Sequence, residues 1–329
     1  MPETLTTVEA LNRALADEME ANNRVLVLGE DVGRLGGIFR VTEGLKGRFG
    51  SERVFDTPAS ESGIVGVALG LAMAGFRPVV EMQFAAYVYP ALEQIIDHVA
   101  KYRLRTKGKL GLPLVIRMPV GGGNGGKEHH AESPETIFVH TAGLKVLSPS
   151  GPLESYDLLA QAIRDPDPVV FLEPIRLYRK AETGELGAGH LPMHQAKLMR
   201  NGTDLTFVSY GGMVGLCVQA ADALAGEGVS AQVLDLRCLS PLDIVSIREC
   251  VRSTGRAVIV HEAPLTLGLG AEISARITEE CFDRLLAPVE RVTGYDTPYP
   301  PPSLEERWWP TLGRIASAAR RIAGYDLHD

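Results

Sequence analysis

Carboxylates and histidines next to glycine-rich or apolar segments are the residues of this chain best suited to chemistry. Glu61 stands between the turn Thr57-Pro58 and residues 62–75 (SGIVGVALGLAMAG), which are almost wholly apolar and small. A carboxylate there has two interpretations. It either interacts favourably with the N-terminus of a following helix, or it is a desolvated acid whose raised pKa lets it hold a proton. Position alone leaves both open.

The histidines offer acid–base groups rather than a metal site. His129 and His130 follow the glycine-rich segment 121–126 (GGGNGG), where a histidine can serve as a general acid or base or simply be solvated. Adjacent residues do not face one side of a helix, and the sequence has no HExxH motif, so a two-histidine metal pair is not predicted. His261 is the last residue of a predicted strand, and we favour a packed histidine there.

The glycine-rich segments do not match known phosphate-binding motifs. Residues 29–37 (GEDVGRLGG) lack the GxGxxG spacing, and residues 121–127 (GGGNGGK) lack the spacing and the hydroxyl residue of a Walker loop. The sequence also has no GxSxG motif, so an acyl-enzyme nucleophile is not supported. We interpret the second segment as a flexible loop over a site.

Alternating strand and helix patterns must position these groups. The alternation runs to about residue 182 and resumes at residue 204, which is typical of parallel sheets covered by helices on both faces. Residues 62–75 are expected to form a helix buried on most sides. The other predicted helices are 6–22, 90–101, 152–164, 213–226, 241–253 and 312–323. The predicted strands are 24–28, 53–56, 77–82, 112–118, 144–147, 169–172, 205–210, 230–235 and 257–261.

Composition narrows the class of protein. The 329 residues are 45% hydrophobic and 22% charged, which is typical of a globular protein of about two domains. The formal charge of −8 argues against a nucleic-acid partner, because nucleic acids are also negatively charged. The four cysteines have no CxxC spacing and are expected to be reduced and packed. With neither a signal sequence nor an apolar run of about 18 residues, we expect a cytoplasmic protein that does not enter a membrane.

Seven blocks of sequence together resemble the beta subunit of the thiamine-diphosphate-dependent decarboxylating component of 2-oxo acid dehydrogenase complexes. They follow the family order over nearly the whole chain, and two of them, 81–95 and 129–135, look closer to branched-chain than to pyruvate members. The blocks are GEDVGRLGGIFRVTEGL (29–45), FDTPASESGIVGVALGLAMAG (55–75), EMQFAAYVYPALEQI (81–95), RMPVGGGNGGKEHHAESPE (117–135), HTAGLKVLSPS (140–150), VIVHEAPLTLGLGAEI (258–273) and RVTGYDTPYPPP (291–302).

The resemblance implies an α/β fold of two doubly wound domains. A transketolase-like pyrimidine-binding domain would span residues 1–184, a linker 185–203, and a transketolase C-terminal-like domain 204–329. It also implies oxidative decarboxylation of a branched-chain 2-oxo acid or pyruvate, followed by reductive acylation of a lipoyl group. Three alternatives stay open: the C-terminal half of a split transketolase-like enzyme, an acetoin dehydrogenase beta subunit, and a non-catalytic assembly subunit.

The resemblance also implies the site residues. Glu61 would hydrogen-bond the aminopyrimidine ring of thiamine diphosphate and so promote loss of the thiazolium proton. Gln83 and Tyr87 would line the pyrimidine pocket, and His130 would serve the acylation of the lipoyl group. Gly66 and Gly70 would permit a close helix contact between subunits.

The resemblance implies two metal ions, a structural K⁺ in this chain and a Mg²⁺ that holds the diphosphate. Segments that hold a structural potassium ion in relatives match Leu114, Val115, Ala162, Ile163, Asp165 and Asp167. Asp167 stands where relatives often have asparagine. The GDG motif that holds the diphosphate through Mg²⁺ is absent from the sequence. An alpha subunit is therefore expected to supply that half of the site in an α2β2 heterotetramer, which docks on the lipoyl acyltransferase.

Overall fold

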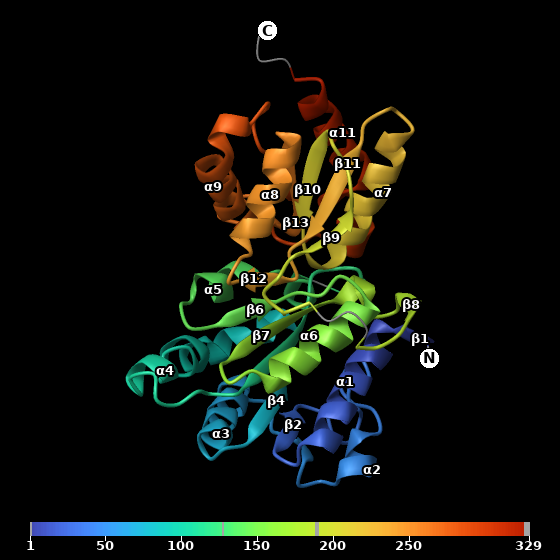
Figure 1. Ribbon diagram of the computed structural model, residues 1–329. Coiled ribbons are helices and arrows are strands. Elements are labelled where there is room, and N and C mark those ends of the chain that lie inside the picture. Colours follow the sequence, from blue (N-terminus) through green and yellow to red (C-terminus); the bar gives the residue numbers. More distant parts are fainter. Residues whose placement is uncertain (1, 127, 188–190, 326–329) are drawn as a thin grey trace. The chain divides into compact units, whose positions relative to one another are not determined.

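The computed structural model describes residues 2–126, 128–187 and 191–325. The chain forms two compact units (Figure 1). The first contains the described residues up to Asn124 and those from His129 to Met193, and the second contains those at 125–128 and from His194 onward. No helix in these described ranges is both long and apolar enough to cross a membrane.

A parallel sheet forms the centre of the first unit, in the strand order β6-β7-β5-β4-β2-β3. Helices cover both of its faces, as predicted for a doubly wound fold (Figure 1). A separate antiparallel pair joins β1 (Glu3–Thr6) to β8 (Ala181–Gly184). The parallel strands are β2 (Val25–Gly29), β3 (Val54–Asp56), β4 (Arg77–Glu81), β5 (Val115–Val120), β6 (Lys145–Leu147) and β7 (Val169–Pro174).

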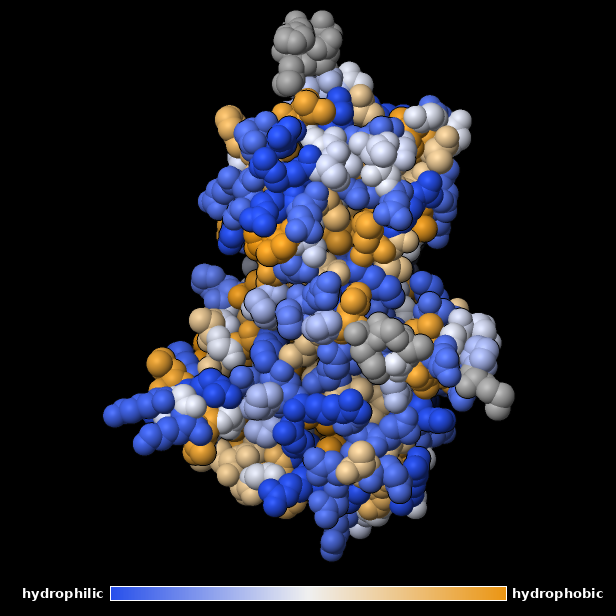
Figure 2. Space-filling model, viewed as in Figure 1, coloured by the Kyte–Doolittle hydropathy of each residue, from blue (hydrophilic) through white to orange (hydrophobic). Residues whose placement is uncertain are grey.

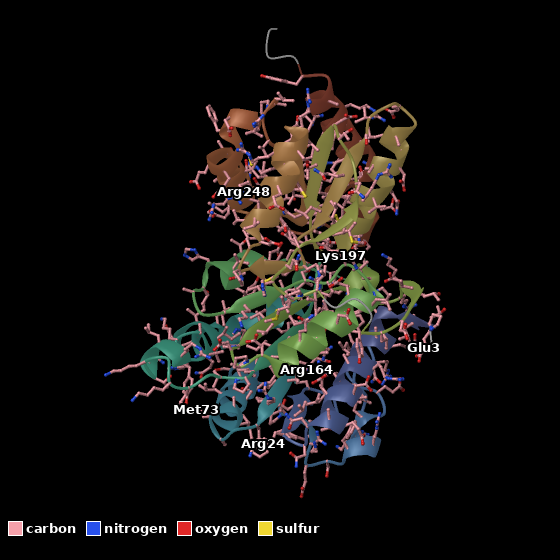
Figure 3. The ribbon with its side chains drawn as sticks, in the orientation of Figure 1. Glu3, Arg24, Met73, Arg164, Lys197 and Arg248 are labelled. Atoms are coloured by element: carbon pink, nitrogen blue, oxygen red, sulfur yellow. The ribbon has the colours of Figure 1, made fainter. Side chains whose placement is uncertain are left out.

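The first long helix of this unit starts at a recognisable signal. Helix α1 has a capping box, in which the Thr6 hydroxyl accepts from the Glu9 N–H and the Glu9 carboxylate accepts from the Thr6 N–H. Arg164 at the end of α6, labelled in Figure 3, donates to Glu18 of α1 at 2.6 and 3.1 Å. The helices are α1 (Thr7–Ala21), α2 (Leu45–Phe49), α3 (Glu61–Met73), α4 (Tyr102–Arg105), α5 (Glu135–His140) and α6 (Pro152–Arg164), with the short 3-10 helices η1 (Ala85–Ala91), η3 (Glu128–His130) and η4 (Ile175–Leu177) and the π-helix η2 (Gln94–Val99).

The second unit has its own sheet, in the order β14-β13-β10-β11-β9. Strand β9 is antiparallel to β11, and the other pairs are parallel. The strands are β9 (Lys197–Arg200), β10 (Leu205–Ser209), β11 (Ala231–Asp235), β13 (Ala257–Pro264) and β14 (Glu290–Gly294), with a short β12 (Cys238–Ser240). The helices are α7 (Val214–Ala225), α8 (Ile244–Thr254), α9 (Leu269–Cys281), α10 (Glu305–Trp308) and α11 (Leu312–Ala323), with the 3-10 turns η5 (Gly211–Met213), η6 (Phe282–Arg284) and η7 (Pro302–Leu304).

Most predicted elements are confirmed within a few residues, and α6 and α11 have the predicted bounds. Several segments differ. The predicted helix 90–101 begins instead in a 3-10 turn, where Pro90 lacks the N–H that a regular α-helix needs, and continues as a π-helix over Gln94–Val99. Residues 197–200 fall in the predicted linker but form β9. Strand β14 and helix α9 were not predicted.

The expectation that residues 62–75 are buried on most sides is wrong for the isolated chain. Helix α3 buries Ile64, Val65, Ala68 and Ala72, but its opposite face is open. Val67 is 53% exposed and Met73, labelled in Figure 3, is 58% exposed. Figure 2 shows weakly hydrophobic atoms at the place of α3, at the lower left of the view. An open face of this kind is typical of an interaction surface.

Candidate active site

Glu61 is the first residue of α3 and lies half-buried in its first turn. Glu30, which directly follows β2, lies close enough to interact with it electrostatically. Burial together with the negative charges of Glu61 and Asp31 raises the pKa of Glu30 above its usual value. A carboxyl group with a raised pKa can hold a proton at a higher pH than an ordinary glutamate. The sequence analysis missed Glu30, although its place after a buried strand was a usable signal.

Gln83 is held at the exit of β4. Its side-chain amide donates to the carboxylate of Asp31 at 3.4 Å. Asp31 has a backbone φ of +61°, and its carbonyl accepts from the N–H groups of Leu35 and Gly37 at 3.1 and 3.0 Å. The loop after β2 therefore brings Asp31, next to Glu30, to the predicted pyrimidine-pocket residue Gln83.

Tyr87 and His130, 43 positions apart, are hydrogen-bonded at 3.1 Å between the phenol oxygen and Nε2. The ring of Phe84 meets the His130 ring edge-on at 4.4 Å between centroids. The His129 ring lies 4.1 Å from that of His130. Because Phe84 and Tyr87 start the 3-10 turn η1, which packs against α3, the turn links this histidine to the Glu61 helix.

A buried ionic cluster lies across three neighbouring strands. Arg117 of β5 is 1% exposed and donates to Glu81 of β4 at 2.8 Å and to Glu173 of β7 at 2.7 and 3.0 Å. The Tyr178 hydroxyl donates to Glu173 at 2.6 Å. Burial raises the pKa of Glu81 and that of Tyr178, while Arg117 opposes both shifts. The cluster thus places two carboxyl groups around a single guanidinium.

This cluster, Glu81–Arg117–Glu173–Tyr178, is connected to the candidate site by side-chain contacts. Gly37 has a φ of +77°, and a Cβ there would lie 2.7 Å from a Glu81 carboxylate oxygen. The Phe39 ring contacts the Tyr178 ring at 4.8 Å and the Phe84 ring at 5.7 Å between centroids. Since Phe84 contacts His130, a continuous set of contacts joins the cluster to the histidine.

The residues matched to a potassium site are partly brought together. The carbonyl oxygens of Ile163 and Asp165 both accept from Arg77 Nη1, at 2.7 and 3.0 Å. The Asp165 carboxylate accepts from Lys145 at 2.7 Å, and that of Asp167 from Arg103. A potassium ion would therefore have to share carbonyl oxygens with Arg77, and the carboxylates already have cationic partners.

The remaining potassium residues lie on the adjacent strand and helix. The Leu114 carbonyl accepts from the Val169 N–H at 2.9 Å, and that of Ala162 from the Asp165 N–H at 3.3 Å. Val115 starts β5. Potassium binding at these residues stays a prediction.

His261 is a packed residue, as favoured from the sequence. It is 0% exposed, and its Nε2 accepts from the Gly270 N–H at 3.2 Å. Burial lowers the pKa of His261 to about 4, so the ring is neutral at physiological pH. The cysteines are all free; Cys217, Cys238 and Cys281 are buried, and Cys250 is half-buried.

Comparison with known proteins shows two family matches in tandem. Residues 3–180 match the transketolase pyrimidine-binding domain and residues 194–315 the transketolase C-terminal domain. A solved structure described as a split gene transketolase, inactive beta4 tetramer, has a TM-score of 0.82 and 22% identity over 97% of this chain and 98% of that one. Fold and domain order therefore define a protein of the transketolase type.

The particular family follows from the more similar sequences. The chain is 49% identical to the 3-methyl-2-oxobutanoate dehydrogenase subunit beta of Mycobacterium tuberculosis, over 97% of this chain and 92% of that one. It is 47% identical to the pyruvate dehydrogenase E1 component subunit beta of Leifsonia xyli, over 98% and 96%. It is 43% identical to the 2-oxoisovalerate dehydrogenase subunit beta of Pseudomonas aeruginosa, over 97% and 95%. This chain belongs to the family of 2-oxo acid dehydrogenase beta subunits.

The ionic cluster gives a prediction about stability. Replacing Arg117 by Leu would leave two buried carboxyl groups without a cation and should lower the free energy of unfolding by about 3–5 kcal/mol. Burial raises the pKa of Glu81 in the folded state and Arg117 opposes that shift, so without Arg117 the stability should fall further as pH rises from about 5 to about 8. Urea unfolding at several pH values measures this. Arg48→Leu is the control, because its ion pair with Glu20 is exposed on both sides. An equal decrease in the free energy of unfolding in the two variants would contradict the role of the cluster.

Proposed function

We propose that this chain is the beta subunit of a 2-oxo acid dehydrogenase. With its alpha subunit it decarboxylates a branched-chain 2-oxo acid or pyruvate, using thiamine diphosphate, and transfers the acyl group to the lipoyl group of an acyltransferase. The observation that carries the proposal is the placement of Glu61 at the start of α3, with Glu30 beside it and the Asp31–Gln83 and Tyr87–His130 pairs in the same unit.

The residues present fit the pyrimidine half of thiamine diphosphate. Glu61 supplies a carboxyl group that can interact with a ring nitrogen, and Glu30, whose pKa is raised by burial and by the charges of Glu61 and Asp31, lies near it. Gln83 offers an amide next to Asp31, and Tyr87 offers an aromatic wall. When bound, thiamine diphosphate supplies the nucleophilic carbon and the electron sink for decarboxylation.

His130 is the proposed acid–base group for the lipoyl step. Its hydrogen bond with Tyr87 and the edge-on contact with Phe84 orient the imidazole. A histidine held in this way can give a proton to, or take one from, a sulfur or oxygen of the incoming substrate near neutral pH. The role rests on the family resemblance together with this geometry.

The other half of the site has to come from a partner. The sequence has no GDG motif, and the described residues contain no group of three or more His, Cys, Asp or Glu side chains placed to hold a metal ion. We therefore assign Mg²⁺ and the diphosphate to an alpha subunit, in an α2β2 assembly that docks on the acyltransferase in the cytoplasm. The preference for a branched-chain substrate over pyruvate, and the acetoin dehydrogenase alternative, depend on that partner as well.

The open face of α3 supports such a partner. A Cβ built at Gly70 would meet no atom of this chain within 4 Å, and one at Gly66 would meet only Gln94 at 3.7 Å. These glycines are therefore not required by packing within the chain. A stripe of small residues beside exposed Val67 and Met73 suits the close approach of a helix from another subunit.

The first prediction concerns Glu61. Glu61→Gln keeps the size of the side chain but removes the carboxyl group, so activity of the reconstituted complex should fall at least about 100-fold. The heterotetramer should still assemble. Turnover of 2-oxo acid is measured beside Glu52→Gln, an exposed glutamate in the same unit, which should keep full activity. A fully active Glu61→Gln enzyme would refute the assigned role.

The second prediction concerns assembly. Gly70→Leu should fold, because Gly70 is exposed and a Cβ there meets no atom outside its own helix within 4 Å, but it should prevent the heterotetramer by blocking the helix contact. Gly47→Leu is the control, since Gly47 is also helical and exposed with no atom within 4 Å of its Cβ position. Size-exclusion chromatography with light scattering reports the mass. An intact tetramer with Gly70→Leu would show that α3 is not at the interface.

The third prediction concerns the cofactor. Thiamine diphosphate with Mg²⁺ should bind tightly to the co-expressed alpha–beta complex and at least about 100-fold more weakly to this chain alone, because the chain lacks the oxygen ligands for the metal. Isothermal titration calorimetry measures both affinities. Tight binding by the isolated chain would mean that the diphosphate site has been assigned to the wrong subunit.

A further inference from the structure

The second unit contains a cavity that the proposed function does not use. Its volume is about 460 Å³. It is lined by residues of β14, by residues of α11 and by Thr311, which directly precedes α11. The polar lining consists of Arg291, Thr311, Arg314, Ser317 and Arg321, with Gly313 at its rim. None of the residues proposed for decarboxylation or acylation belongs to this lining.

Positive charge exceeds negative charge around this cavity. Arg321 is paired with Glu290 at 2.6 and 2.9 Å. Arg314 donates instead to the backbone carbonyls of Trp308, Trp309 and Thr293 at 2.7 to 3.3 Å. Of the three arginines that line the cavity, only Arg321 is paired closely with a carboxylate, that of Glu290.

Arg291 also lacks a close carboxylate. It donates to the Leu265 carbonyl at 3.2 Å. Asp296 interacts with Arg291 electrostatically, but its carboxylate accepts from the N–H and hydroxyl of Thr266 at 2.9 and 2.6 Å. Within the described ranges neither Arg291 nor Arg314 forms an ion pair. Three arginines thus face two nearby carboxylates, Glu290 and Asp296, and the remaining positive charge favours an anion.

The start of α11 adds backbone donors to the same cavity. Thr311 caps the helix by accepting from the Arg314 N–H at 3.2 Å. Gly313 has no side chain, and a Cβ there would meet only the Thr311 hydroxyl, at 4.0 Å. The space beside Gly313, in the first turn of this 12-residue helix, is therefore open, and the partial positive charge of a helix start favours an anion there.

We propose that this cavity binds a phosphate group, either free or carried by a small phosphorylated metabolite. Guanidinium groups match the geometry of phosphate oxygens and remain charged at all physiological pH values. A helix N-terminus favours the same ligand. The volume lies in the range of small-molecule sites, of about 300–1,000 Å³, which leaves room for an organic part next to the phosphate.

The test uses the alpha–beta complex saturated with thiamine diphosphate and Mg²⁺, so that the catalytic site cannot take the probe. Inorganic phosphate and glycerol 3-phosphate are titrated by calorimetry at constant ionic strength, with sodium chloride as the reference. Saturable binding of phosphate is expected. Tighter binding of glycerol 3-phosphate would identify a phosphate ester as the ligand, and equal or weaker binding would identify free phosphate.

Variants locate the binding. Gly313→Asp places a carboxylate over the helix start and should weaken phosphate binding at least about tenfold, as should Arg291→Gln. Gly313→Ala adds volume without charge and should stay within about twofold. Arg320→Gln, on the same helix but paired with Glu227, is the charge-matched control for Arg291→Gln. No binding beyond that of chloride, or equal weakening by Arg320→Gln, would overturn the proposal.

Discussion

A guanidinium buried between two carboxylates is the interaction on which the first unit depends. Arg117 joins Glu81 and Glu173 from the two strands that flank its own, and it is 1% exposed. Charges removed from water are tolerated when they are paired, so the ion pairs of Arg117 hold β4, β5 and β7 together where these side chains lie. Contacts from this cluster run through Phe39 and Phe84 to the ring of His130. The orientation of a proposed acid–base group thus rests on a structural ion cluster behind it.

The same unit is built as part of a larger site. Glu61 lies half-buried at the start of α3, and the opposite face of that helix carries glycines with open space beside them. Both features become intelligible if a second chain covers this region, because burial would then desolvate the carboxyl and fill the space over the glycines. The match of nearly the full chain to dehydrogenase beta subunits agrees with this interpretation.

The second unit distributes its charges differently. Its buried histidine, His261, is neutral and serves packing at the start of α9, where Gly268 and Gly270 leave it room. Its uncompensated charge lies instead at the cavity lined by β14 and α11, where guanidinium groups bond to backbone carbonyls. Carbonyl partners hold an arginine in place without neutralising it, so the positive charge stays available for a ligand.

The sequence by itself determined the class of fold, and it supplied the candidate site residues. Buried parallel strands appear as continuous apolar runs and amphipathic helices repeat every 3.6 residues, so α6 and α11 could be placed to the residue. Glu61, Gln83, Tyr87 and His130 were found through blocks of family sequence. The sequence did not show that η2 is a π-helix or that residues 197–200 form an edge strand, because packing of distant segments decides both.

Only the tertiary structure decided which groups meet. The pairs Glu30 with Glu61, Asp31 with Gln83 and Tyr87 with His130 each join residues at least 31 positions apart, since parallel strands bring remote loops to one edge. It also showed that α3 has an open face, although the segment is apolar throughout. An all-apolar helix has no polar side to indicate which face meets solvent, so its neighbours in space determine what is buried.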